Sequence, residues 1–372
     1  MHYPLKNMIT NEKIYYWLTL SGISQVRQQK LIEFYKTPFD LWEAVRSEKR
    51  VIEPNIGAKH FEALEYYRKE ELLDKDLDSL YQRGISLVCY DDERYPERLK
   101  QKEVGSPRLL FCKGDTSLLK TTCVAIVGTR RCTRYGKLMA EKIANGLAEA
   151  GVTVVSGLAD GVDTYAHRAV IESGGKTIAV LGSGVNRITP AINQGFADIM
   201  LASGRGLIIS EYLPSFSGAK HTFPERNRII SGLSLGVVVV EAGDRSGALI
   251  TARQAGEQGR EAFAIPGNAD NPQSNGCNAL IKQGAHLVTE AGDILEVLNL
   301  QKNETEKPHK LQLDIFEDTV YNELLSGRKH FDELLDRLKV NPQELMTTLS
   351  ALELKRIVRR EPGNMYAINI AN

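Results

Sequence analysis

The chain has 372 residues, of which 42% are hydrophobic, 25% are charged and 31 are glycine, a composition typical of a globular α/β protein with two or three domains. Its 47 lysines and arginines balance 47 acidic residues, which argues against a protein that coats nucleic acid through bulk charge, so any nucleic-acid site must be a local basic groove. With five cysteines but no C-x-x-C pair, no apolar run of about 18 residues and no secretory signal, we predict a cytoplasmic protein without a disulfide frame, zinc site or membrane span.

Apolar residues recur at helical spacing from Asn11 to Gly84, which predicts an N-terminal helical domain over residues 1–84. The segment Gly22-Ile23-Ser24 within it looks like a helix-hairpin-helix turn, whose backbone amides could hold a phosphate. Because Ser24 replaces the second glycine usual in that turn, we favour a small helix-hairpin-helix or SAM-like packing domain over a DNA contact.

Beyond Gly84 the pattern changes to short β-rich runs that end in glycine turns and lead into helical stretches. Most runs are apolar throughout, which is typical of strands covered on both faces. Their spacing by one helix each predicts a parallel, right-handed βαβ sheet, and hence a Rossmann-like domain over residues 85–299 that binds ligands at the carboxyl ends of its strands. The predicted strands are 85–90, 123–127, 152–155, 177–181, 207–210, 237–241, 262–265 and 285–288.

The C-terminal part resembles a winged-helix domain over residues 312–372, separated by a polar linker over 300–311. Its expected helices cover 320–325, 331–338 and 342–354, and its expected wing pairs 356–358 with 366–368. The last helix carries Glu344 and Glu353 but no lysine or arginine, whereas a helix that binds a DNA groove needs cations. We therefore hypothesise a protein-interaction or regulatory role for this domain.

Two glycine turns carry groups that suit a phosphate. The strand 123–127 leads into Gly128-Thr129-Arg130-Arg131, ahead of a helix that begins near Tyr135, so backbone amides, a helix dipole and two arginines meet at one place. The strand 152–155 ends in Ser156-Gly157, which adds a hydroxyl and flexible backbone at the same sheet edge. A purely architectural turn is the alternative in both cases.

The segment 211–225 is a long predicted loop that contains Lys220, His221 and Phe223 and runs into Arg226-Asn227-Arg228. Cations can pair with the phosphates of a single strand while Phe223 stacks on a base; in the alternative, Phe223 is a core residue and the charges are solvated. After the strand 237–241, Ser246 stands at a plausible N-cap, where its hydroxyl either caps the helix that carries Thr251 or meets a phosphate.

We predict no catalytic residue, metal or cofactor. Gly182-Ser183-Gly184 follows a strand, but Arg187 stands where a dinucleotide-binding series has its third glycine. No Walker A loop is present, because Gly136-Lys137 lacks the upstream glycine. His167 has no cysteine or carboxylate at ligand spacing, so we expect a packed histidine.

These motifs, in this order, resemble those of the DNA-processing protein A (DprA/Smf) family. The matching segments are 124–130, 156–167, 210–212, 223–234, 246–252 and 278–285, and the run Phe223-Pro224-Glu225-Arg226-Asn227-Arg228 is the most specific. The resemblance implies a protein that binds and protects incoming single-stranded DNA in natural transformation and loads a RecA-type recombinase onto it. It also implies a homodimer formed near Leu280, Ile281 and Leu287.

By motif position, Arg130, Lys220 and Phe223 would be the principal DNA contacts. The full predicted nucleic-acid-binding set is Gly128, Thr129, Arg130, Arg131, Ser156, Gly157, Lys220, His221, Phe223, Arg226, Asn227, Arg228, Ser246 and Thr251. Asp160 departs from the family, since many relatives carry a basic residue there, and we expect it to turn away from phosphate.

Two other interpretations remain open. One is a nucleotide-processing enzyme of the phosphoribohydrolase-like Rossmann group, although the loop 241–247 lacks the Pro-Gly-Gly-x-Gly-Thr series of those enzymes. The other is a scaffold that contacts only proteins and whose glycine turns are architectural.

Overall fold

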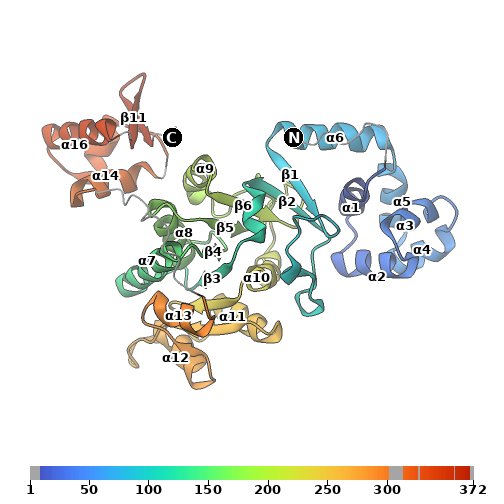
Figure 1. Cartoon of the computed structure of the whole chain (residues 1–372). Helices are drawn as coiled ribbons and strands as arrows, with labels where there is room; N and C mark the ends of the chain where they lie inside the picture. The colour runs from blue at the N-terminus through green and yellow to red at the C-terminus, as the bar shows by residue number, and fades with distance from the viewer. Residues whose placement is uncertain (1–8, 301–312, 326, 356, 369–372) are drawn as a thin grey trace.

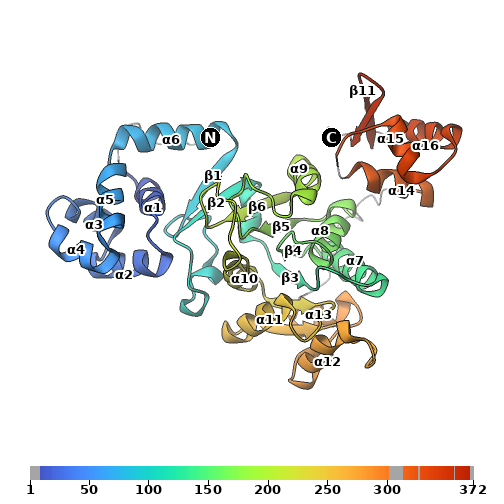
Figure 2. The ribbon, with the colours of Figure 1, turned by 180° about the vertical axis from the view of Figure 1, so that it is seen from behind.

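The structure, a computed structural model, describes residues 9–300, 313–325, 327–355 and 357–368. A nine-stranded sheet lies at the centre, with a helical unit on one side and a small three-stranded unit on the other (Figures 1 and 2). Within the described residues, no helix combines the length and the apolar character that a bilayer crossing requires.

The N-terminal unit is helical, as predicted. Its helices are α1 (Asn11–Leu20), α2 (Gln25–Tyr35), α3 (Pro38–Ala44), α4 (Lys49–Ile56), α5 (Ala58–Tyr67) and α6 (Glu70–Gln82). Trp17 and Trp42 meet edge to face in its core, with ring centroids 4.8 Å apart. The unit also packs on the sheet, because Tyr16 of α1 contacts Phe111, so the predicted boundary at residue 84 stays a prediction.

The central sheet is mostly parallel. Its strands are β1 (Ile85–Cys89), β2 (Leu109–Gly114), β3 (Cys123–Val127), β4 (Thr153–Ser156), β5 (Thr177–Val180), β6 (Gly206–Ser210), β7 (Gly236–Val239), β8 (Glu261–Ala264) and β9 (His286–Leu287), in the order β1-β2-β6-β5-β4-β3-β7-β8-β9. Successive strands run outward from β3 as far as β6, and the chain then crosses back to place β7 against β3. This reversal between β3 and β7 opens a crevice at the carboxyl ends of the strands.

One edge of the sheet differs from the prediction. The strand β2 was not predicted, and it pairs antiparallel with both β1 and β6. The connection from β1 to β2 contains only the short 3₁₀ turns η1 (Glu97–Lys100) and η2 (Lys102–Val104), whereas the prediction identified strands by the helix that follows each one. The expected all-parallel sheet is therefore wrong at this edge.

Helices cover both faces of the sheet because side chains alternate along its strands. Val124 and Ile126 of β3 face α7 (Arg134–Glu149) and α8 (Val162–Glu172), with α13 (Ala291–Val297) beside them. Ala125 and Val127 face the opposite layer, which contains α10 (Thr222–Leu233) and α11 (Gly247–Glu257). The helices α9 (Gln194–Ala202) and α12 (Asn275–Lys282) lie toward the two ends of the sheet (Figure 1).

The C-terminal unit has the expected winged-helix architecture. It contains α14 (Ile315–Leu324), β10 (Lys329–His330), α15 (Phe331–Leu338), α16 (Pro342–Leu354), β11 (Val358–Glu361) and β12 (Met365–Ile368), with sheet order β10-β12-β11. Asn341 caps α16 by accepting a hydrogen bond from the Gln343 amide, as the sequence predicts. Most of the predicted linker, residues 301–311, lies outside the described residues. The start of α14 lies near α8, where Asp318 and Glu172 line a cavity of about 460 Å³.

Candidate nucleic-acid interface

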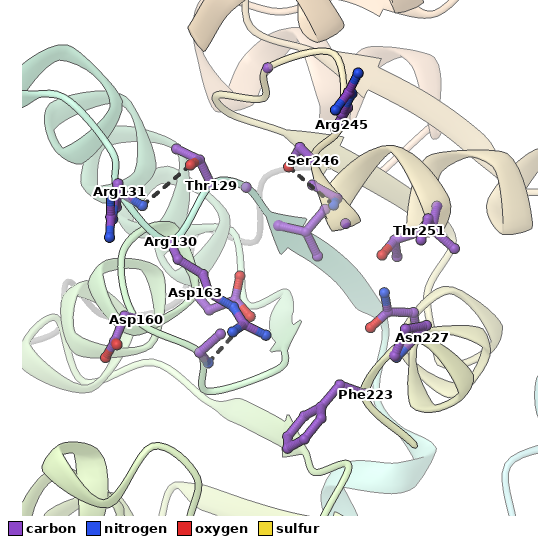
Figure 3. Close-up of a pocket in the computed structure, with 18 of the residues that line it drawn as sticks. Thr129, Arg130, Arg131, Asp160, Asp163, Phe223, Asn227, Arg245, Ser246 and Thr251 are labelled. Atoms are coloured by element: carbon purple, nitrogen blue, oxygen red, sulfur yellow. Dashed lines mark hydrogen bonds between the residues drawn. The ribbon is translucent and has the colours of Figure 1, made fainter. Parts of the chain in front are cut away.

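A cleft of about 950 Å³ lies at the carboxyl ends of β3, β4 and β7. Its walls come from the β3–α7 and β4–α8 turns on one side and from α10, α11 and the β7–α11 loop on the other (Figure 3). Its lining includes Gly128, Thr129, Arg130, Arg131, Asp160, Asp163, Thr189, Pro190, Lys220, Phe223, Arg226, Asn227, Asp244, Arg245, Ser246 and Thr251. The structure thus brings Arg130 and Lys220, which lie 90 positions apart in the sequence, to one cavity.

The β3–α7 turn exposes its arginines, whereas the backbone amide of Thr133, the residue that caps α7, is already bonded within the protein. The buried carboxylate of Glu241 accepts hydrogen bonds from the Thr133 amide at 2.8 Å and the Thr133 hydroxyl at 2.9 Å. Gly136 is required there, since a Cβ at this position would collide with that carboxylate. The expectation that the N-terminus of α7 offers its amides to an anion is therefore wrong at Thr133, because an internal carboxylate already occupies that place.

Polar groups of the β4–α8 turn form hydrogen bonds within the protein. The Ser156 hydroxyl donates to the Ile126 carbonyl at 2.6 Å, and the amides of Gly157 and Ala159 both donate to Asp163. Burial raises the pKa of Asp163, while Arg226 and these amides oppose the shift. Ser156 and Gly157 are thus buried behind the cleft surface, and we leave them out of the proposed interface. Asp160 is exposed on the rim of the cleft.

Phe223 stands on the first turn of α10, because the helix begins at Thr222 and the loop before it is shorter than predicted. Its ring lies against Gly182 and Gly218, where a Cβ would come within 2.9 Å and 3.2 Å of it. Gly184 also lacks room for a Cβ, because the carbonyls of Leu213 and Pro214 press against it. Of the two glycines that suggest a dinucleotide site, Gly182 thus lies, with Gly218, against the Phe223 ring that borders the cleft (Figure 3), and Gly184 lies against loop carbonyls.

The arginines of the Phe223–Arg228 motif have different roles. Arg226 is only 5% exposed, and its guanidinium donates to the Gly157 carbonyl at 2.8 Å. Arg228 points to another side of α10, where it pairs with buried Glu211 at 2.5 Å, and it does not line the cleft. His221 is exposed but also lies outside the cleft lining. Asn227, between the two arginines, is partly exposed and lines the cleft, as Phe223 does.

Four cations of the cleft carry no ion pair. Within residues 9–300, none of Arg130, Arg131, Lys220 and Arg245 has an acidic partner within 4 Å, and all four are exposed. Arg245 was not predicted as a binding residue. Its position in the loop after β7, next to Ser246, is the sequence signal that could have identified it. Ser246 itself caps α11 by accepting a hydrogen bond from the Ala248 amide. The cleft therefore presents four unpaired cations and one aromatic ring, together with the exposed carboxylates of Asp160 and Asp244.

His167 has the packed position that the sequence predicts. His167 is fully buried, its Nδ1 lies 2.6 Å from the Thr177 hydroxyl, and burial lowers its pKa to about 3, as suits a packed neutral imidazole. Among the described residues, no group of three His, Cys, Asp or Glu side chains has the arrangement of a metal site. Of the predicted dimer residues, Leu287 on the edge strand β9 is 52% exposed, while Leu280 and Ile281 are half-buried.

Known proteins resemble this chain over its central and C-terminal parts. The family model described as DNA recombination-mediator protein A matches residues 86–299, more than half of the chain. The chain belongs to this family. A second model, the DprA winged helix domain, matches residues 304–364, so the resemblance inferred from the motifs is confirmed.

Two members of the DNA recombination-mediator protein A family illustrate the likeness. The DNA processing protein DprA of Streptococcus pneumoniae is 40% identical over 288 residues, which cover 77% of this chain and 98% of that protein. Its X-ray structure matches with a TM-score of 0.66 and 39% identity, again over 77% of this chain and 98% of that one. DNA processing protein A from Helicobacter pylori, in a structure described as showing a single-stranded DNA binding mode, matches with a TM-score of 0.50 and 32% identity, over 58% of this chain and 95% of that one.

Proposed function

We propose that this chain binds single-stranded DNA in the cleft between the β3–α7 turn and α10. The observation that carries the proposal is the convergence of four exposed, unpaired cations with the Phe223 ring in one cavity. Unpaired cations attract phosphates without first breaking an internal ion pair, and an aromatic face stacks on any unpaired base. The single-stranded DNA binding named for the Helicobacter pylori relative supports the same assignment.

The charge of the cleft sets a measurable salt dependence. Each phosphate neutralised on a single strand contributes about −0.7 to the slope of log affinity against log salt, so four contacts give a slope of about −3. Fluorescence titration of labelled oligothymidylate at several salt concentrations measures this slope. A slope near zero for the wild-type chain would refute the assignment of these four cations to phosphates.

Single residues then separate phosphate contacts from stacking. We expect Arg130→Ala and Lys220→Ala each to reduce the slope by about 0.7, and Phe223→Ala to weaken binding by about 1 to 3 kcal/mol while leaving the slope nearly unchanged. Arg253→Ala is the matched control, because Arg253 is an exposed cation on α11 that pairs with Glu257 outside the cleft. Equal competition by duplex DNA of the same length would contradict stacking by Phe223.

The wider role that we propose follows from family membership. We infer that the chain works in the cytoplasm, protects incoming DNA during natural transformation, and loads a RecA-type recombinase onto the bound strand as a homodimer. The exposed edge near Leu287 supports the position of the dimer contact. Sedimentation of the wild type and of Leu287→Glu tests the dimer, and recombinase filament assembly on DNA coated by a single-strand binding protein tests the loading.

We propose binding without catalysis. The loop 241–247 lacks the glycine series of phosphoribohydrolase-like enzymes, and both carboxylate oxygens of its buried Glu241 accept hydrogen bonds from Thr133. Release of free base from nucleoside monophosphates by the purified chain would overturn this part of the proposal.

A further inference from the structure

Arg226 is a buried cation in the wall of the cleft, and its guanidinium donates hydrogen bonds to three oxygen atoms of the protein. One guanidinium nitrogen donates to the carbonyls of Gly157 and Val180, at the ends of two neighbouring strands. Its Nε donates to the Asn227 side-chain oxygen at 2.9 Å. Gly157 can approach so closely only because it lacks a Cβ, which would collide with the guanidinium. Arg226 thus joins the ends of β4 and β5 to the helix α10.

The 157–161 turn, which Arg226 contacts, has an unfavourable backbone conformation at Leu158. Leu158 has φ = 54° although it carries a fully buried leucine side chain, and L-residues other than glycine rarely occupy this left-handed region. Asp163 holds the same turn from the opposite side through the Gly157 and Ala159 amides, at 3.1 Å and 3.4 Å. Such a conformation persists only where its surroundings fix it, and Arg226 and Asp163 are two of the groups that do so.

The 157–161 turn contacts the backbone of Arg130. Gly161 has φ = 79°, and a Cβ there would come within 2.7 Å of the Arg130 carbonyl and still closer to the Thr129 carbonyl. The Val162 amide also donates to the Thr129 carbonyl at 3.3 Å. The Thr129–Arg130 backbone therefore rests directly on the end of the turn, and a shift of the turn moves the segment that carries the exposed arginine.

We propose that Arg226 is a positioning residue, whose guanidinium fixes the 157–161 turn and through it the place of Arg130 in the cleft, and that it is not itself a phosphate contact. This inference rests on the proposed function and deepens it. Arg226 also orients the Asn227 side chain, because its Nε donates to the Asn227 oxygen.

The chemistry of the site requires an arginine. Several donors in a rigid planar fork reach Gly157, Val180 and Asn227 together, whereas a lysine ammonium is a single point at the end of a flexible stem. Burial lowers the pKa of Arg226 to about 10 while nearby Asp163 opposes the shift, so the side chain is still charged at neutral pH. The site therefore needs the hydrogen-bonding geometry of the guanidinium group as well as its positive charge.

The test compares two substitutions that both keep the positive charge. We expect Arg226→Lys to weaken binding of labelled oligothymidylate about tenfold or more, through the lost hydrogen bonds and the displaced turn. Arg253→Lys, at an exposed cation of α11 outside the cleft, is the matched control and should change affinity less than about threefold. Binding by Arg226→Lys as tight as that of the wild type would overturn the inference.

A double-mutant cycle separates positioning from general damage to the protein. If Arg226 acts through Arg130, then Arg130→Ala costs less affinity in the Arg226→Lys background than in the wild type. Two independent phosphate contacts, or a global loss of stability, would instead give additive effects, and additivity contradicts the inference. Asp163→Asn provides a second route, because it loosens the same turn with an isosteric side chain and leaves Arg226 in place.

Amide hydrogen exchange without DNA tests directly whether Arg226 fixes the 157–161 turn. We expect the Gly157 and Ala159 amides to exchange faster in Arg226→Lys than in the wild type, while amides in α11 keep their wild-type rates. Unchanged exchange at these two amides would overturn the inference that Arg226 fixes the 157–161 turn, even where the chain binds DNA. Failure of the wild-type chain to bind oligothymidylate would overturn the proposed function instead.

Discussion

Gly182→Ala is expected to weaken binding of single-stranded DNA, although residue 182 has no side chain to contact a ligand. An added Cβ would lie 2.9 Å from Cδ1 of Phe223, 3.0 Å from its Cα and 3.1 Å from its amide nitrogen, whereas ordinary contacts begin at 3.4 Å. The ring and the first turn of α10 must therefore retreat by about 0.5 Å. Two of the three atoms belong to the backbone, so a rotamer change of Phe223 cannot relieve the clash.

The magnitude follows from the stacking that is lost. A displaced ring forfeits part or all of about 1 to 3 kcal/mol per stacked base, which corresponds to about a 5-fold to 150-fold loss of affinity, and overpacking should also lower the free energy of unfolding by about 1 to 3 kcal/mol. Because no charge changes, the salt dependence should stay that of the wild type.

The assay is titration of labelled oligothymidylate, with chemical denaturation to check the fold. Gly256→Ala is the control, because Gly256 lies in α11 with nothing within 4 Å of an added Cβ. In a Phe223→Ala background, Gly182→Ala should cost little further affinity. Wild-type affinity in Gly182→Ala would refute the reasoning that the glycine is the seat of the ring.

Three further predictions concern charges. Arg228→Ala should leave the salt dependence of DNA binding unchanged but lower the free energy of unfolding by about 3 to 5 kcal/mol, because it strands the buried Glu211 carboxylate; a reduced salt slope in oligonucleotide titrations would contradict this. Arg245→Ala should reduce that slope by about 0.7, and an unchanged slope would remove Arg245 from the interface. Burial and nearby Asp318 raise the pKa of Glu172 to about 7. The folded state therefore binds this proton more tightly than the unfolded state, so the free energy of unfolding falls as pH rises from about 4.5 to 7. Urea denaturation at pH 5 and pH 7.5 should show a smaller fall in the free energy of unfolding for Glu172→Gln than for the wild type. An equal fall would contradict the assignment of this pH dependence to Glu172.

The sequence was informative where local pattern and strand order decide the structure. Apolar runs that end in glycine identified the parallel strands, and the rule that parallel strands end at one edge brought Arg130 and Lys220 together across 90 positions. The strand β2 was missed, since no helix follows it and its neighbours run antiparallel.

Burial of charged residues was the part that the sequence left undecided. Arg226 and Arg228 have the same side chain two positions apart, but residues at i and i+2 of a helix face different directions, so one enters the cleft wall and the other meets Glu211. The helical spacing indicates that their roles differ, without telling which of them is exposed. The hydrogen bonds from Thr133 to Glu241 join positions 108 apart, and no local sequence pattern predicts such a pair.

The contact between Glu241 and Thr133, at the start of α7, has a consequence for ligand size. A lone phosphate, or a mononucleotide, binds best where several backbone amides converge on it, and Glu241 fills such a place at Thr133. In the proposed function, the remaining attraction comes from separate arginines and a lysine around the cleft, which a polymer can engage at once. We therefore expect mononucleotides and inorganic phosphate to compete poorly with even a short single strand for this site.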